Sequence, residues 1–194
     1  MHEQLQFIRN VRNLSYINRC SNTPHIKEQS VAEHSFFVAL YSMLIADLEN
    51  IRIMNESKEE IYDTSEVLKM AILHDVEESI TGDILYPIKN ENKEIKPLLE
   101  EAIERIVNNE LFKGMDNLLL EKHYKKLWKK SNLKESRLVR AVDKFELLIY
   151  AVGELELGNT NMLEMYHHVL EILKTNFKEI ITLQKLIETI EEHL

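Results

Sequence analysis

Apolar residues recur three and four positions apart along most of this chain, which is the spacing of one buried face on an α-helix. The pattern predicts helices over roughly 2–17, 31–50, 64–80, 91–110, 115–130, 135–157 and 161–193. Only 4 glycines and 3 prolines occur in 194 residues, too few for the many tight turns of a β-sheet protein. We therefore expect an all-α fold, and a chain of this length fits a single domain over residues 1–194.

Composition narrows the compartment and the partners. Cys20 is the single cysteine, so an intrachain disulfide is excluded, and no stretch has the pattern of a signal peptide, which favours a cytoplasmic protein. The longest apolar runs, such as 36–46, fall far short of the roughly 20 residues that span a bilayer, so no membrane partner is expected. A net charge of -9 repels nucleic-acid backbones, so no nucleic-acid partner is expected either.

The predicted helix over 31–50 has a well-marked start. Ser30 and Glu33 match a capping box, in which each side chain bonds to the other residue's backbone N–H. This places His34 in the first turn of the helix, where side chains are accessible to a ligand. The apolar residues that follow predict one buried stripe: Val31, Phe37, Val38, Tyr41, Leu44, Ile45 and Leu48.

The sharpest polar cluster follows the apolar run Val67–Leu73. His74 and Asp75 are adjacent, so on a helix they point about 100° apart and can face one ion only near a helix end or between helices. Imidazole and carboxylate ligands suit a divalent metal. Glu78 is i+4 from His74 on the same predicted helix, a separation that suits a base acting on metal-bound water.

Three sequence blocks in this order resemble the HD-domain phosphohydrolases: Glu33-His34-Ser35, 73–83 (LHDVEESITGD) and Ala141-Val142-Asp143-Lys144. Two further segments resemble the 5'-deoxynucleotidase branch: Tyr16-Ile17-Asn18-Arg19 and 154–159 (ELELGN). The resemblance covers roughly residues 10–160 and implies an all-helical HD-type bundle with its metal-site core at about 30–145.

The resemblance also implies roles for individual residues. One divalent ion would be held by His34, His74, Asp75 and Asp143, and Glu78 matches the family's catalytic glutamate. The substrate would be bound by Arg19 at its phosphate and by Asp83 at a sugar hydroxyl, with Cys20 and Lys89 as further candidate contacts. Cobalt, manganese, magnesium, iron and nickel all accept such mixed ligands, so the metal stays open.

Two positions depart from the family pattern. Cys20 stands where the bacterial deoxynucleotidases have a tryptophan that crowds the sugar, so strict selectivity for 2'-deoxy substrates is not implied. The segment 84–89 also differs from the family's Pro-Thr-Pro pattern. A wider pocket could admit a ribonucleotide, a modified sugar or a longer phosphate chain.

The leading hypothesis is thus an enzyme that releases phosphate from nucleoside 5'-phosphates. The enzymatic alternative is a nucleoside di- or triphosphate hydrolase that removes several phosphates. A second alternative is a non-catalytic nucleotide sensor, and a third is a purely structural helical bundle. Ordinary roles also stay open for three features: pairing of Asp143 with Arg140 or Lys144, a cap on the Thr81 turn by Glu78, and a solvated face for the lysines of 122–134. The apolar stripe of 161–193 could pack internally or against a second subunit, as in a homodimer.

Overall fold

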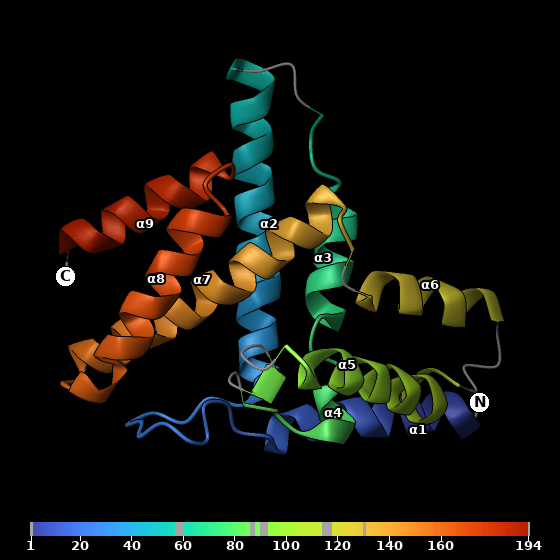
Figure 1. Ribbon diagram of the computed structural model, residues 1–194. Helices are drawn as coiled ribbons and strands as arrows, with labels where there is room; N and C mark the ends of the chain where they lie inside the picture. Colours follow the sequence, from blue (N-terminus) through green and yellow to red (C-terminus); the bar gives the residue numbers. More distant parts are fainter. Residues whose placement is uncertain are drawn as a thin grey trace. The chain divides into compact units, whose positions relative to one another are not determined.

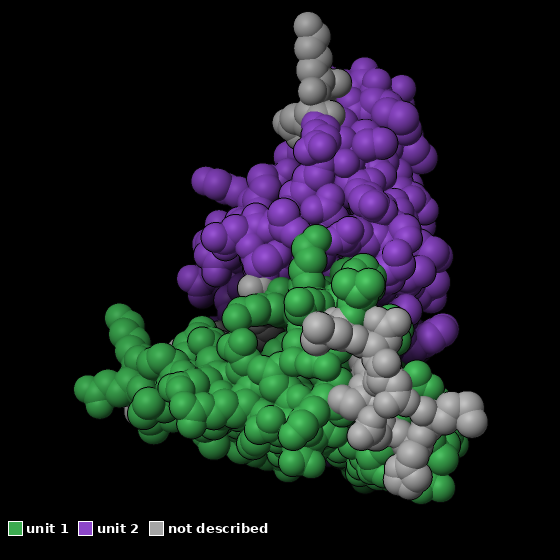
Figure 2. Space-filling view, turned by 90° about the vertical axis from the view of Figure 1, so that its right-hand side faces the viewer, with its two compact units in different colours: residues 1–24, 28–35, 73–129 green, residues 25–27, 36–72, 130–194 purple. Residues whose placement is uncertain are grey.

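The computed structural model describes residues 2–56, 60–85, 88–89, 93–113, 118–129 and 131–193, without the side chains of residues 2, 3 and 118. The chain forms two compact units (Figure 2): unit 1 comprises residues 1–24, 28–35 and 73–129, and unit 2 comprises 25–27, 36–72 and 130–194. Each unit has its own buried apolar side chains. The single domain expected over residues 1–194 stays a prediction.

The described residues form helices joined by turns, with no strand among them, so the all-α prediction is confirmed (Figure 1). Unit 1 contains α1 (His2–Val11), η1 (Arg12–Tyr16), α4 (Glu78–Thr81), α5 (Ile95–Ile106), the π-helical η3 (Val107–Phe112) and α6 (Leu118–Trp128). Unit 2 contains α7 (Lys134–Glu156), η4 (Thr160–Met162), α8 (Leu163–Asn176) and α9 (Ile181–His193). Two helices belong to both units by residue number: α2 (Val31–Glu56) and α3 (Thr64–Leu73).

The core of unit 1 gathers around η3, which contacts α1, α4, α5 and α6. Phe112 is fully buried, and its ring stacks on Phe7 with the ring centroids 6.4 Å apart and meets Trp128 edge-on at 5.9 Å. Aromatic pairs at such separations add roughly 0.5–1.5 kcal/mol beyond burial. This core supports α4, the short helix that begins at the candidate base Glu78.

In unit 2, α8 packs along α7 and is followed by α9. One buried acid ties α2 to the start of α9: Glu49 accepts hydrogen bonds from the Thr182 N–H at 2.9 Å and from the Arg52 guanidinium at 2.6 Å. The first N–H groups of a helix have no partner within the helix, so a carboxylate placed there is stabilising.

Several predicted helices are divided in the structure. The helix predicted over 161–193 breaks after Asn176, and the Gln184 side chain donates to the carbonyls of Leu173 and Phe177 at 3.2 and 3.0 Å. The break allows apolar residues on both sides of it to be buried: Met162, Val169, Leu173, Phe177, Ile180, Leu183 and Ile187. This stripe therefore packs internally, the first of the two alternatives that the sequence left open. The predictions for 2–17, 64–80 and 91–110 are divided too.

The single buried stripe predicted for α2 is wrong in part. Three of its residues are buried: Val31, Val38 and Ile45. Three are exposed: Phe37, Leu44 and Leu48. α2 is apolar on more than one face, which residue spacing alone does not reveal. It is also the one described helix that is long and apolar enough to cross a membrane, a test that core helices of soluble proteins and signal sequences also pass.

Candidate metal centre and active site

His34 lies in the first turn of α2, whose start is fixed by the predicted capping box. The Glu33 N–H donates to Ser30 Oγ at 3.2 Å, and the Ser30 N–H donates to the Glu33 carboxylate at 2.8 Å. An isolated bridge between Asn18 and Ser30 ties this start to the preceding segment. The capping box is confirmed, and the His34 side chain that it positions is 0% exposed.

His74 and Asp75 lie in a tight turn rather than in a helix. The helix predicted over 64–80 ends at Leu73. The residues that follow form turns in which an N–H bonds to the carbonyl three positions earlier, such as that from the Val76 N–H to the Leu73 carbonyl at 3.2 Å. The metal-binding candidates and Glu78 therefore do not share one helix, contrary to the prediction. The turn brings His74 Nε2 to within 3.1 Å of Asp75 Oδ2, whereas a continuous helix would direct these side chains about 100° apart.

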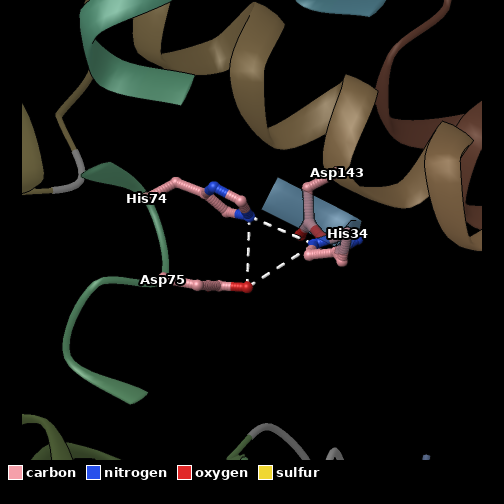
Figure 3. A group of neighbouring side chains, drawn as sticks. All are labelled: His34, His74, Asp75 and Asp143. Carbon is pink, nitrogen blue, oxygen red and sulfur yellow. Dashed lines mark hydrogen bonds and ion pairs between the residues drawn. The ribbon is translucent and has the colours of Figure 1, made fainter. Parts of the chain in front are cut away.

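Three side-chain atoms of unit 1 converge on one point (Figure 3). His34 Nε2 lies 3.2 Å from His74 Nε2 and 3.5 Å from Asp75 Oδ2. Ligand atoms bound at about 2.0–2.2 Å to one divalent ion are themselves roughly 3–3.5 Å apart. Two ring nitrogens that face each other must share a proton or face a cation. The three residues therefore fit a divalent metal ion.

Asp143, the fourth predicted ligand, lies on α7. Asp143 belongs to unit 2, and its ligation of the same ion stays a prediction. Lys144 Nζ also donates to Asp143 Oδ2 at 3.0 Å, one of the pairings that the sequence left open. Because a carboxylate can accept at both oxygens, this pairing and metal ligation are compatible.

The Asp75 carboxylate is held in its charged form. Burial by itself would raise its pKa, but the neighbouring imidazoles of His74 and His34 outweigh this and hold the pKa of Asp75 well below its usual range. A metal ligand must be deprotonated to bind. Asp75 is thus prepared for ligation over the whole neutral range.

Glu78, the predicted catalytic residue, is the first residue of α4 and is 2% exposed. Burial and the negative charge of Asp75 raise the pKa of Glu78 to about 8. Lys89 Nζ donates to Glu78 Oε1 at 2.5 Å, while the buried Oε2 has no hydrogen-bond partner in the described part of the chain. Although burial opposes it, the surrounding carboxylates raise the pKa of Lys89, so this lysine stays charged. Because Oε1 bonds to Lys89 and Oε2 has no partner among the described residues, the Glu78 side chain does not cap the Thr81 turn.

Lys89, a predicted substrate contact, donates to the candidate base Glu78, and its contact with the substrate stays a prediction. Both residues are largely shielded from solvent, with 26% of the Lys89 side chain and 3% of the Glu78 side chain exposed. A hydrogen bond donated by a charged group in such surroundings is among the stronger ones in proteins. The lysine thereby fixes the direction of the Glu78 carboxyl group.

Glu77 is a buried acid for which no role was predicted. It accepts a hydrogen bond from Trp128 Nε1 at 2.8 Å, and burial, followed by the charge of Asp75, raises its pKa. Glu77, Glu78 and Asp75 have carboxylate oxygens within 4.8 Å of one another. The sequence did show that Glu77 is an acid near the end of the apolar helix predicted over 64–80. Its partner on α6 was not apparent.

The predicted substrate residues Cys20 and Asp83 are brought together. The Cys20 N–H donates to Asp83 Oδ2 at 3.3 Å, and the Arg19 N–H donates to the Gln29 carbonyl at 2.9 Å. Cys20 has a φ of 52°, a left-handed conformation that is uncommon for a residue other than glycine and recurs at ligand-binding sites. Cys20, which departs from the pattern of the bacterial deoxynucleotidases, is therefore also unusual in its backbone conformation.

Another buried acid, Glu154 on α7, holds the segment 25–27 within unit 2. Its carboxylate accepts from the Ile26 and Lys27 N–H groups, both at 2.7 Å, and from Asn159 Nδ2 at 2.7 Å. Tyr150 adds a hydrogen bond from its hydroxyl to the Lys27 carbonyl at 2.7 Å. The sequence placed Glu154 and Asn159 in a family block without a function, and this clamp supplies one.

Some predicted features have ordinary roles or lie outside the described residues. In the basic stretch 122–134, Lys125 pairs with Glu121 at 2.5 Å and Lys129 with Glu104 at 3.0 Å, while Leu127 is buried. This is the pattern of a solvated helix face. Tyr86 and Pro87, in the segment that departs from the family pattern, lie outside the described residues.

Solved structures share this fold. An HD-domain phosphohydrolase from Listeria innocua has a TM-score of 0.78 and 25% identity, covering 97% of this chain and 88% of its own. A Pyrococcus horikoshii protein follows with a TM-score of 0.70, 24% identity and coverage of 96% and 97%. An HD phosphohydrolase from cyanophage S-2L has a TM-score of 0.60, 17% identity and coverage of 95% and 96%. With its His/Asp cluster, the chain is an HD-domain phosphohydrolase that binds a divalent metal.

Within this class, residues 6–193 match the family of YfbR-like 5'-deoxynucleotidases, and the chain belongs to that family. A 5'-deoxynucleotidase from Klebsiella pneumoniae is 25% identical over 167 residues, which are 82% of this chain and 78% of the relative. One from Cronobacter sakazakii is 26% identical over 167 residues, with the same coverage. The protein is thus a metal-dependent enzyme that hydrolyses nucleotide phosphates.

Proposed function

We propose that this enzyme removes the 5'-phosphate of nucleoside and deoxynucleoside monophosphates, with one divalent ion held by His34, His74, Asp75 and Asp143. The observation that carries the proposal is the triangle of His34 Nε2, His74 Nε2 and Asp75 Oδ2, whose sides measure 3.1–3.5 Å. The bacterial relatives named 5'-deoxynucleotidases support this substrate class.

The protein's own residues supply positioning and proton transfer. When bound, a divalent ion at this site neutralises phosphate charge and lowers the pKa of a water molecule. We assign Glu78 Oε2 as the atom that accepts a proton from the attacking water, because Lys89 already bonds to Oε1. Arg19 is assigned to the phosphate, where its planar guanidinium can bind two oxygens. Asp83 and the adjacent Cys20 are assigned to the sugar.

The water oxygen attacks phosphorus while the bond from phosphorus to the 5' oxygen breaks. The proton that Glu78 takes up balances the proton needed by the departing 5' hydroxyl, so Glu78 acts as a base and then as an acid. The products are a nucleoside and inorganic phosphate. Proton transfer of this kind contributes about 10²–10⁴-fold to the rate.

Two substitutions test the site. Asp75→Ala should lose about one divalent ion per chain relative to wild type, measured by elemental analysis of the purified proteins. Glu78→Gln should keep the metal and lose about 10²–10⁴-fold in turnover, with Glu121→Gln on α6 as a control of the same chemistry. Equal metal content in Asp75→Ala and wild type would reject the metal site, and unchanged turnover in Glu78→Gln would reject the assigned base. Full turnover in Asp75→Ala would argue against the enzyme mechanism as a whole.

A nucleotide panel separates the monophosphatase from its alternatives. AMP, dAMP, ADP and dATP are incubated with the enzyme, and nucleoside, phosphate and pyrophosphate are resolved. Nucleoside and phosphate from AMP or dAMP would support the proposal. Pyrophosphate as the main product from dATP would favour the hydrolase that removes several phosphates. Binding without any product would favour the nucleotide sensor.

The metal, the compartment and the assembly form part of the same proposal. Two imidazoles and two carboxylates accept cobalt, manganese, magnesium, iron or nickel, and also zinc, which the cyanophage structure contains. Running the panel with each ion identifies the productive metal. A cytoplasmic location is part of the proposal, as suits an enzyme that acts on a small-molecule substrate. We expect a homodimer and no nucleic-acid or membrane partner.

A further inference from the structure

A cavity of about 420 Å³ lies in unit 1, where α1, η1, α4 and η3 come together. Its volume is within the range of about 300–1,000 Å³ that is usual for sites of small ligands. None of the proposed metal ligands or substrate contacts lines it. The described residues that line it are polar with one exception: Gln6, Asn10, Asn13, Ser79, Glu110 and the apolar Ile80.

Hydrogen bonds fix the orientation of the three amide side chains in this cavity. Asn10 Nδ2 donates to the Glu110 carbonyl at 3.2 Å, and Asn13 Nδ2 donates to the Ser79 carbonyl at 3.2 Å. Because a backbone carbonyl can only accept, the nitrogen end of each amide must face it. Asn10 Oδ1 is thereby turned to Gln6 Nε2, which donates to it at 2.8 Å. The nitrogen ends of all three amides are thus directed at the protein itself.

The groups left over in the cavity are acceptors. No described residue donates to Gln6 Oε1, to Asn13 Oδ1 or to the Glu110 carboxylate. No lysine or arginine is among the described lining residues, so an anion would find no cationic partner. A primary ammonium group carries three N–H donors and a positive charge. It therefore matches the three acceptor groups in both number and sign.

The acid of this cavity comes from an unusual backbone segment. Glu110 lies in η3, the π-helix Val107–Phe112. Turns of π-helix are rare and occur frequently at functional sites. The hydrogen bond from Asn10 on α1 to the Glu110 carbonyl ties this turn directly to the cavity. The backbone and the acceptor groups thus mark the same place independently.

We propose that this cavity binds a small organic cation through its primary ammonium group. The N–H groups donate to Gln6 Oε1, Asn13 Oδ1 and the Glu110 carboxylate, and the alkyl chain lies against Ile80. The short helix α4 lines the cavity and begins at Glu78, so the cation contacts the element that carries the proposed base. Binding of the cation does not require the proposed phosphatase activity, and the two can therefore fail separately.

Calorimetric titration of the metal-loaded enzyme with 1,4-diaminobutane tests the site. One molecule per chain should bind, whereas 1,4-butanediol, which has the same length and no charge, should not. Glu110→Gln should raise the Kd of the diamine by about ten- to a hundredfold, as expected for a lost charged acceptor. Gln6→Met should raise it by at least about threefold. Glu188→Gln, an exposed acid on α9, is the control and should leave the Kd unchanged.

Several outcomes of the titration would overturn the proposal. These are no binding of the diamine, equally tight binding of the diol, and equal Kd values in wild type and Glu110→Gln. Asp75→Ala should bind the diamine as wild type does, and loss of binding in this variant alone would place the amine at the metal centre instead. Displacement of the diamine by an equal concentration of calcium would make the cavity a metal site.

Chemical shifts locate the bound amine without any substitution. In the metal-loaded enzyme, 1,4-diaminobutane should move the side-chain amide resonances of Gln6 and Asn13 and the backbone N–H resonances of Ser79 and Ile80. The diol should leave these resonances in place. Shifts confined to residues outside the cavity would contradict the assigned site even if the diamine binds.

Discussion

Lys89 Nζ and Glu78 Oε1 are joined by a 2.5 Å hydrogen bond, so the candidate base is held by an ammonium group eleven positions further along the chain. Glu78 comes to this pair from α4, and Lys89 comes from the segment after Gly82. The orientation of the base is therefore set by tertiary structure rather than by a helix. We propose that Lys89 acts as a positioning residue.

Replacing Lys89 by methionine should lower turnover by about ten- to a hundredfold and leave the metal content unchanged. The estimate follows from the roughly 1.5–3 kcal/mol that a hydrogen bond to a charged group contributes. Steady-state kinetics with dAMP, together with metal analysis, measures both effects. The control is Lys93→Met, an exposed lysine of the same connecting segment. An increase in KM at constant kcat would instead support Lys89 as a substrate contact.

Trp128 offers an optical readout of metal binding, because it is the only tryptophan in the chain. Its Nε1 donates to Glu77 at 2.8 Å, and the Glu77 carboxylate belongs to the same acidic cluster as Asp75. Adding cobalt to chelator-treated protein should change the tryptophan emission until one ion per chain is bound. In Asp75→Ala the change should vanish. Loading of the metal without any spectral change would contradict the expected coupling.

Glu154→Gln should lower the free energy of unfolding by about 1–3 kcal/mol at neutral pH, since buried N–H groups lose a charged acceptor. Although burial opposes it, the hydrogen bonds from Ile26, Asn159 and Lys27 lower the pKa of Glu154 in the folded protein. Its stabilising effect is therefore complete above the unfolded-state pKa of about 4.3 and is lost as the pH falls through the lower folded-state value.

Urea unfolding of Glu154→Gln and wild type across this acidic range measures the effect. The difference in unfolding free energy between them should be largest near neutral pH and should shrink on acidification. Glu156→Gln, an exposed acid on the same helix, is the control and should change stability little. A constant difference at all pH values would contradict a role for the ionised carboxylate.

Cys20→Trp should raise the preference for dAMP over AMP at least about tenfold in kcat/KM, because a bulky ring beside Asp83 would crowd the 2' hydroxyl of ribose. The Cys20 N–H already lies 3.3 Å from Asp83 Oδ2, so a side chain at this position is close to the proposed sugar site. Cys20→Ser is the control of similar size. Equal dAMP and AMP selectivity in all three proteins would place the sugar elsewhere.

Local signals explain which parts of the fold were predictable. The capping box at Ser30 marked the start of α2, and α7 at Lys134–Glu156 lies within one residue of the predicted 135–157 at each end. The breaks after Leu73 and Asn176 contain neither glycine nor proline. They arise from tertiary packing, which buries Phe177 and Ile180 on either side of one break.

For the site too, features encoded in short sequence blocks were predictable, whereas contacts made by tertiary packing were not. The blocks around His34, His74 and Asp143 predicted which residues gather, since residue types and order carry that information. The pairings of Lys89 with Glu78, Trp128 with Glu77, and Glu154 with the segment 25–27 join residues 11, 51 and 127 or more positions apart. Only the folded chain reveals such partners, and for Lys89 it adds a proposed positioning role to the predicted substrate contact.

α2 carries His34 in its first turn, at a start set by the capping box of Ser30 and Glu33. Binding of a metal ion by His34 and formation of this first turn therefore involve the same residue. Two equilibria that share an element obey reciprocity: if an ordered turn tightens metal binding by some factor, the bound metal stabilises that turn by the same factor. Loss of the cap at Ser30 would then weaken the metal site, although Ser30 is not among the proposed ligands.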